Sequence, residues 1–194
     1  MEDPAAIEEK LKSMSPEELK EFQKKNCIFC HIISGKVQSK KVYEDDVCTG
    51  VLDINPANPG HILLVPNEHY AIMPMMPDDV IARMFQVAKH LSQSMLKALK
   101  AQGTNIFVAN GVAAGQKAQH FMIHIIPRMP DDGVSFSLPQ KQLTDSDMDE
   151  IAKRIRNRLN DLLGIKEEPQ QVAGKKVANV QTDLDAVSKI FKNG

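Results

Sequence analysis

The spacing of apolar residues predicts one long amphipathic helix near the middle of the chain. Between residues 77 and 102, apolar side chains recur at steps of three and four, as Val80, Met84, Val87, Leu91, Met95 and Leu99. This spacing places them on one face of a helix. Pro77 suits the start of such a helix and Gly103 suits its end. We therefore expect a helix that covers a sheet.

Short runs typical of strands lie on both sides of this helix. They are residues 41–43, 47–53, 62–65, 105–109 and 120–127. The proline- and glycine-rich segment 55–60 separates two of them, and a glycine-bearing loop at 110–116 joins the last two. Strand-length runs divided by turn residues predict an antiparallel sheet. Together with the helix, the pattern predicts an α+β fold.

Helical patterns extend the chain at both ends. Ser15 and Glu18 form the pattern of a capping box at a helix start, and Thr144 suits the cap of another helix that would stop at Gly164. After Gly164, the sequence predicts a polar linker at 166–176 and a short amphipathic helix at 182–192. We expect an N-terminal helical extension at 1–26, a core domain at 27–135 and a C-terminal helical extension at 136–194.

Composition narrows the possible partners. The 194 residues carry 24 Lys and Arg against 25 Asp and Glu, so no strong overall field favours nucleic acid or an anionic membrane surface. No apolar run is long enough to span a membrane, and the N-terminus carries no hydrophobic signal core. An odd number of cysteines, two of them spaced Cys-x-x-Cys, fits a reducing compartment. We expect a cytoplasmic protein without a membrane span.

Cys27 and Cys30 form a candidate metal site. Two thiolates at this spacing can bind one tetrahedral ion, but a structural zinc site needs two further ligands. On composition alone, all six histidines are candidates. A pair of reduced thiols without metal is the alternative, and a redox pair fits less well because the motif does not follow a strand at the head of a βαβ unit.

The strand expected around residue 120 presents two histidines on one face. Alternation along a strand places His120, Met122 and His124 together. Two hydrogen-bonded structural histidines are one interpretation. The other is an anion site, because the preceding glycine loop can approach a ligand closely and Arg128 supplies a positive charge.

Several motifs in order resemble the histidine triad (HIT) family between residue 27 and about residue 130. They are Cys27-Ile28-Phe29-Cys30, Leu52-Asp53-Ile54-Asn55-Pro56, Pro59-Gly60-His61-Ile62-Leu63-Leu64-Val65-Pro66, Glu68-His69, Asn110-Gly111, Gly115-Gln116 and His120-Phe121-Met122-Ile123-His124. The resemblance implies a five-stranded antiparallel sheet with a long helix. It also implies pairing of two chains as a homodimer.

The resemblance further implies two sites and a cofactor. A purine nucleotide or dinucleotide would bind at Asp53, Ile54, Asn55, Asn110, Gly115, Gln116, Lys117 and His124. Asp53 would contact the ribose, and the last five residues, from Asn110 to His124, would face the phosphates. Lys117 departs from the family, which often has serine there. In zinc-bearing relatives, the ligands match Cys27, Cys30, His69 and His120.

Met122 stands where the family has its nucleophilic histidine. A thioether cannot exchange a proton with a leaving group, so the covalent route to phosphoryl transfer is lost while His124 remains of the triad. We expect a nucleotide-binding protein with catalysis lost or strongly reduced. Two alternatives stay open: an active hydrolase of dinucleoside polyphosphates or nucleoside phosphoramidates, and a zinc-stabilised interaction or RNA-binding module using the basic run 153–158.

Overall fold

The structure is a computed structural model that describes residues 13–165. These residues belong to two compact units, divided between Phe136 and Ser137. The linker predicted at 166–176 and the helix predicted at 182–192 lie outside the described residues. Within the described part, no helix is both long and apolar enough to cross a membrane.

A five-stranded antiparallel sheet forms the centre of the first unit, as the α+β prediction required. Its spatial order is β1-β2-β3-β5-β4. The strands are β1 (Lys41–Glu44), β2 (Cys48–Leu52), β3 (Ile62–Pro66), β4 (Gly103–Phe107) and β5 (Ile123–Arg128). Strand β5 therefore enters the sheet between β3 and β4, which brings the last part of the unit beside residues 62–66.

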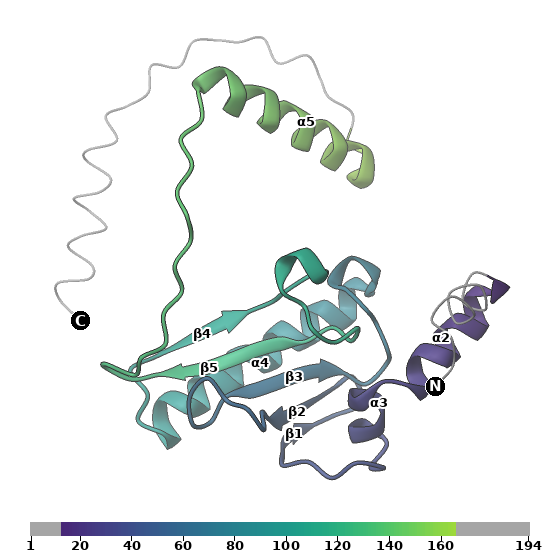
Figure 1. The fold of residues 1–194 in the computed structure, drawn as a ribbon, viewed down its shortest axis with the longest axis vertical. Coiled ribbons are helices and arrows are strands. Elements are labelled where there is room, and N and C mark those ends of the chain that lie inside the picture. Colours follow the sequence, from purple (N-terminus) through teal and green to yellow (C-terminus); the bar gives the residue numbers. More distant parts are fainter. Residues whose placement is uncertain (1–12, 166–194) are drawn as a thin grey trace, which may run out of the picture. The chain divides into compact units, whose positions relative to one another are not determined.

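Helix α4 (Asp78–Ala98) covers one face of this sheet (Figure 1). Met84, Val87 and Met95 from the predicted apolar face are buried against strand residues such as Leu64 and Ile125. Burying each large apolar side chain contributes about 1.5–3 kcal/mol, so this face supplies much of the core. The helix ends before the predicted residue 102, because Lys100 adopts a left-handed φ of 54°.

The opposite face of the sheet carries a short helix that the sequence pattern did not predict. Helix α3 (Ile28–Ile33) buries Phe29 in a second apolar cluster with strand residues Val51, Leu63 and Val65. No side chain caps its start at Cys27. A six-residue helix without a capping signal leaves little trace in the sequence. Helix α2 (Pro16–Lys25), which precedes it, does begin with the predicted Ser15–Glu18 capping box.

Two predicted strands are displaced in the structure. The strand expected at 105–109 is β4, two residues earlier, because it pairs with β5 from Gly103↔Arg128 to Phe107↔His124. The strand expected from residue 120 begins only at Ile123. Before that point, the Phe121 amide donates to the Tyr70 carbonyl at 2.6 Å, beyond the end of β3. His120 thus lies just outside the ladder.

The second unit contains helix α5 (Asp145–Leu163). Thr144 forms a capping box with Asp147, and Gly164 ends the helix with a left-handed φ of 65°, both as the sequence indicated. The apolar positions of this helix, including Ile155 and Leu162, are exposed within the unit. The first unit also contains two short 3-10 helices, η1 (Met73–Met75) and η2 (Val112–Ala114).

Candidate functional site

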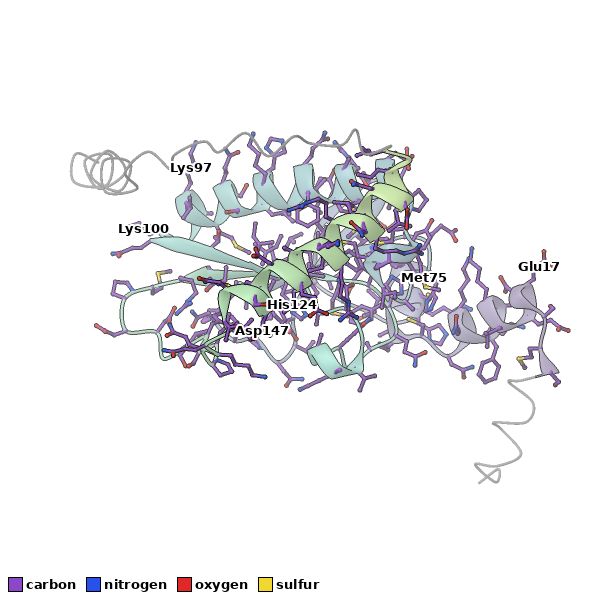
Figure 2. The ribbon with its side chains drawn as sticks, turned by 90° about the horizontal axis from the view of Figure 1, so that it is seen from above. Glu17, Met75, Lys97, Lys100, His124 and Asp147 are labelled. Carbon is purple, nitrogen blue, oxygen red and sulfur yellow. The ribbon has the colours of Figure 1, made fainter. Side chains whose placement is uncertain are left out.

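The segment 120–125 divides its side chains between the two faces of the sheet. Phe121, Ile123 and Ile125 are buried in the cluster beneath α4. Met122 packs instead with the cluster beneath α3. His124 is opposite Leu63 of that second cluster, and Figure 2 shows it on the side of the sheet away from Lys97 of α4. The alternation predicted from the sequence is therefore present.

Four candidate ligand atoms converge at the start of α3. The Cys27 sulfur lies 3.3 Å from Nδ1 of His120, and the Cys30 sulfur lies 3.3 Å from Nδ1 of His69. The Cys30 sulfur is also 3.7 Å from Nδ1 of His120. All four ligand atoms lie within 4.8 Å of one another. Residues from three separate segments thus form one compact group.

This group fits a tetrahedral metal ion. Bonds of about 2.3 Å to sulfur and about 2.05 Å to nitrogen place tetrahedral ligand atoms about 3.6 Å apart. The observed sulfur–nitrogen distances, 3.3 to 3.7 Å, bracket that value. Nε2 of His120 lies 3.0 Å from the Pro66 carbonyl oxygen. The carbonyl accepts a hydrogen bond from Nε2–H, which leaves Nδ1 unprotonated and available as a ligand. Nε2 of His69 is buried without a partner among the described residues.

Burial shapes the protonation of these groups. It lowers the pKa of His120 to about 4 against the opposing effect of the Pro66 hydrogen bond. Burial also lowers the pKa of His69, assisted by Lys24 and Lys20 nearby. Burial, together with the neighbouring Cys27, raises the pKa of Cys30 to about 12. Without a cation, the cluster is a set of neutral imidazoles beside a thiol that resists ionisation.

A second cluster on the same face joins Asp53, His61 and His124. Nε2 of His61 lies 3.1 Å from Nδ1 of His124, and Nδ1 of His61 lies 3.4 Å from a carboxylate oxygen of Asp53. Burial lowers the pKa of both histidines, although Asp53 acts in the opposite direction on each. Phe107 of β4 packs on the His124 ring with centroids 5.7 Å apart. The imidazoles are therefore paired and neutral at pH 7.

A hollow of about 820 Å³ with a mixed lining adjoins this cluster. Asp53 lines it and also approaches His61, so one carboxylate connects the hollow with the histidine pair. The Ile54 side chain, also in the lining, is 90% exposed. Ile32 and Leu52 add further apolar surface. The lining also contains Gln38, Ser39, Lys40 and Lys41, so the hollow offers apolar contact beside polar and positively charged groups.

The glycine loop holds itself together through Gln116. Its amide accepts from the Gly111 amide at 2.7 Å and donates to the carbonyls of Ala71 and Ala118. Gly111 and Gly115 have left-handed φ values of 89° and 87°, which glycine adopts without strain. The three hydrogen bonds of the Gln116 side chain therefore fix the conformation of the loop.

The remaining predicted nucleotide residues occupy loop surfaces. Asn110 uses its side-chain oxygen to accept from the Met73 amide at 3.0 Å. The Asn55 amide donates to Asp53 at 2.9 Å in a turn that fixes the carboxylate. Lys117 is exposed. The structure thus brings Asp53 and His124 into one cluster, while these three residues belong to the surrounding loops.

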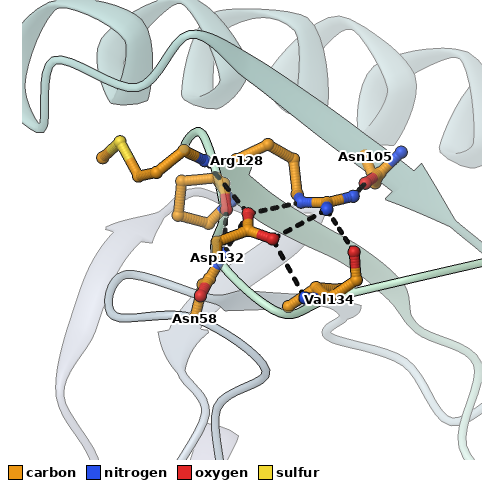
Figure 3. A network of polar contacts seen from close by, with 7 residues as sticks. Asn58, Asn105, Arg128, Asp132 and Val134 are labelled. Carbon is orange, nitrogen blue, oxygen red and sulfur yellow. Dashed lines mark hydrogen bonds and ion pairs between the residues drawn. The ribbon is translucent and has the colours of Figure 1, made fainter.

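The expectation that Arg128 offers a free positive charge for an anion is wrong. Its guanidinium forms an ion pair with Asp132, with nitrogen–oxygen distances of 2.7 and 2.8 Å (Figure 3). It also donates to Asn105 at 2.5 Å and to the Val134 carbonyl. With its donors used inside the protein, Arg128 fastens the segment after β5 to the sheet.

His61 is the residue that sequence reasoning failed to assign to the site. It was only one of six candidate metal ligands, yet the structure pairs it with His124 and not with the cysteines. The one feature of the sequence that could have indicated a site role for His61 is its position directly before the apolar residues of β3. A sheet that pairs β3 with β5 brings residue 61 beside residue 124, but the sequence does not disclose that pairing.

Comparison with known proteins identifies the class. Residues 34–131 match the HIT domain family, and the chain belongs to that family. A HIT-like protein of Methanocaldococcus jannaschii is 42% identical over 132 residues, which cover 67% of this chain and 98% of that protein. An adenylylsulfatase of Arabidopsis thaliana is 38% identical over 137 residues, covering 69% of this chain and 70% of the relative.

One of the similar solved structures is described as zinc-bound. It is a zinc-bound histidine triad family protein from Mycobacterium smegmatis, with a TM-score of 0.56 and 28% sequence identity. The match covers 72% of this chain and 99% of that one. The five-stranded sheet with its helices is thus the fold of the HIT family.

Proposed function

We propose that this HIT-family protein binds a purine nucleotide in the hollow beside Asp53. The observation that carries the proposal is the position of that carboxylate, between the hollow and the His61–His124 pair. A base would pack on Ile54, the ribose hydroxyls would donate to Asp53, and the phosphate would accept from His124. Asn55, Asn110, Gly115, Gln116 and Lys117 would shape the loops around it.

The proposed cofactor is one zinc ion bound by Cys27, Cys30, His69 and His120. The donor set supports this, since two sulfurs and two imidazole nitrogens suit zinc and converge at tetrahedral spacing. Four protein ligands leave no open coordination position, so the ion would stabilise the fold. It would neutralise the thiolates and join helix α3 to the sheet.

Met122 would occupy the place of the family's middle histidine, and turnover would be lost or strongly reduced. The side chain packs in the apolar cluster beneath α3, between His120 and His124 along the chain. A thioether neither forms a stable nucleotidyl intermediate nor carries the proton that the leaving group needs. Binding and chemistry would thus be separated in this protein.

Binding is tested by calorimetry with adenosine and guanosine monophosphate. We expect saturable binding of at least one of them. Asp53→Ala should weaken it about tenfold, because the ribose loses its acceptor. Asp46→Ala, which removes an exposed carboxylate from the β1–β2 turn, is the matched control and should leave affinity unchanged. Absence of binding at millimolar nucleotide would contradict the proposal.

Loss of turnover is tested by restoring the imidazole. Met122→His should confer hydrolysis of a nucleoside phosphoramidate or a dinucleoside polyphosphate that exceeds the wild-type rate at least tenfold. Only part of a natural rate is expected, because a new imidazole also needs neighbouring groups that fix its orientation. Met122→Gln, which adds polarity without a nucleophile, should remain at background.

A second candidate is an active hydrolase of adenylyl compounds. The similar Arabidopsis thaliana protein is an adenylylsulfatase, and the paired His61 and His124 offer imidazole nitrogens beside the proposed phosphate position. Wild-type turnover of adenylyl sulfate that disappears in His124→Ala and persists in Met122→Leu would establish this candidate. It would also reject loss of catalysis.

We infer in addition that two chains pair through the β4 edge. In the described part of the chain β4 pairs only with β5, and its Ile106 and Phe107 are partly exposed. An unpaired apolar strand edge invites association. Light scattering should report a homodimer at micromolar concentration, and a monomer would reject this inference.

A further inference from the structure

We propose that Asn58 is a positioning residue: through Ala57 and His61, it holds His124 in the tautomer that presents Nε2–H to a phosphate. The proposal deepens the proposed nucleotide site and rests on it. It concerns a residue outside the hollow, which reaches the histidine pair through a short chain of hydrogen bonds.

The side-chain amide of Asn58 anchors the loop between β2 and β3. It donates to the Pro127 carbonyl at 2.9 Å and to the Asp132 carboxylate at 2.7 Å (Figure 3). Asp132 is itself fixed by Arg128. The loop is therefore tied to the end of β5, the same strand that carries His124. These hydrogen bonds fix the position of the loop relative to the two histidines.

The anchored loop approaches His61 from two sides. The Asn58 carbonyl accepts from the His61 backbone amide at 3.0 Å. The Ala57 amide donates to Nδ1 of the His61 ring at 3.2 Å. Because a backbone N–H is always a donor, Nδ1 must act as the acceptor and carries no proton. In a neutral imidazole, the proton of His61 is then on Nε2.

That proton determines the state of His124. Nε2 of His61 faces Nδ1 of His124 at 3.1 Å, so the first donates and the second accepts. The proton of His124 is consequently on Nε2. A neutral ring in this tautomer can donate one hydrogen bond to a phosphate oxygen without any change of charge.

Asp53 favours the opposite arrangement. Its carboxylate oxygen lies 3.4 Å from Nδ1 of His61 and would attract a proton there. With the proton on Nδ1, the Ala57 amide would face a second donor, and His124 would have to donate through Nδ1 instead. The loop anchored by Asn58 therefore decides which tautomer the pair adopts.

Long-range proton–nitrogen NMR of the imidazoles, at pH 7.5 without nucleotide, tests the proposal directly. Wild-type His61 and His124 should both show the Nε2–H tautomer. Asn58→Ala should give a mixture of tautomers at both rings, because the released loop no longer holds the Ala57 amide against Nδ1. Asn105→Ala removes another partner of Arg128 but leaves the loop contacts, and should retain the wild-type pattern.

Calorimetry with adenosine monophosphate supplies the second measurement. Asn58→Ala should weaken affinity about threefold to tenfold, the effect of losing one oriented hydrogen bond, and Asn105→Ala should not. Should Asn58→Ala lose the amide dispersion of a folded protein, Asn58→Ser keeps one donor and should give a smaller change in the same direction. Unchanged tautomers in the folded variant would overturn the proposal.

The two measurements separate two failures. A tautomer change in Asn58→Ala with no nucleotide binding by the wild type would reject the nucleotide site and, with it, the role of His124 toward phosphate. Wild-type nucleotide binding with identical tautomers and affinity in Asn58→Ala would reject the positioning role alone.

Discussion

Two clusters lie on the same face of the sheet and differ in what their histidines face. In the cluster at α3, the imidazole nitrogens of His69 and His120 point toward cysteine sulfurs. In the cluster at Asp53, the nitrogens of His61 and His124 point toward each other. The first is a closed set of ligand atoms, while the second adjoins a hollow of about 820 Å³. Histidines on one face of the sheet thus lie in two different environments.

The two clusters also differ in enclosure, which is what distinguishes the proposed stabilising site from the proposed binding site. His120 is fully buried and His69 is 5% exposed, so protein atoms already cover most of the surface of both imidazoles. His124 is only partly buried, and Asp53 lines the hollow. We therefore expect the first cluster to determine stability and the second to determine affinity.

The largest expected effect is loss of stability when the closed cluster loses its ion. Zinc present at a thousand times its dissociation constant stabilises the folded state by about 4 kcal/mol, or about 15 °C in Tm for a domain of this size. A strong chelator should lower Tm by that amount in a thermal scan. Metal analysis should give one zinc per chain beforehand.

Cysteine variants provide the matched control for zinc. Cys30→Ala should contain no zinc and should no longer respond to the chelator. Cys48→Ala removes a buried thiol that lies outside the cluster, and should keep both the zinc and the chelator response. A wild-type protein without zinc, whose Tm ignores the chelator, would remove the distinction drawn between the clusters.

A smaller effect is expected when acid protonates the paired histidines. Burial lowers the pKa of His61 and of His124 in the folded state, so below about pH 6.5 the unfolded chain binds more protons than the folded one. Stability contributed by this pair is present above pH 6.5 and is lost as pH falls. Linkage limits the loss to about 1.4 kcal/mol per pH unit for each histidine.

Urea unfolding at pH 7.5 and 5.5, with zinc and without nucleotide, measures this loss. The double variant His61→Gln/His124→Gln should lose less stability between the two pH values than the wild type. His90→Gln, which changes an exposed histidine of α4, should behave as the wild type. Equal losses in wild type and double variant would show that the pair is not held neutral by burial.

The sequence predicted the parts of this comparison that depend on local pattern. The apolar face of α4 follows from its spacing, and the placement of Met122 opposite Phe121 follows from strand alternation. The sequence thus predicted on which face of the sheet Phe121, Ile123 and Ile125 lie and that Met122 lies on the other. The resemblance to the HIT family supplied the four proposed metal ligands, and the structure brings their ligand atoms within 4.8 Å of one another.

The sequence could not supply the contacts that depend on strand order and loop anchoring. His61 reaches His124 only because β5 inserts beside β3. Arg128 forms an ion pair with Asp132, four residues later in the chain. The sequence alone does not show the turn that brings the two residues together, so the Arg128 charge was predicted to be available to an anion. Helix α3 has no side-chain cap, and its Phe29 is buried against strand residues. Tertiary packing therefore stabilises this helix, and that packing cannot be read from the local sequence.

The smallest expected effect belongs to the residue between the two clusters. Met122 packs among apolar side chains, and leucine has nearly the same volume, so Met122→Leu should change the free energy of unfolding by less than about 1.5 kcal/mol. Zinc content and nucleotide affinity should both stay at wild-type values, because neither cluster uses the thioether. A tenfold fall in affinity, measured by calorimetry, would instead place the Met122 sulfur against the nucleotide. That result would make the apolar surface beneath α3 part of the binding site and would join the two clusters functionally.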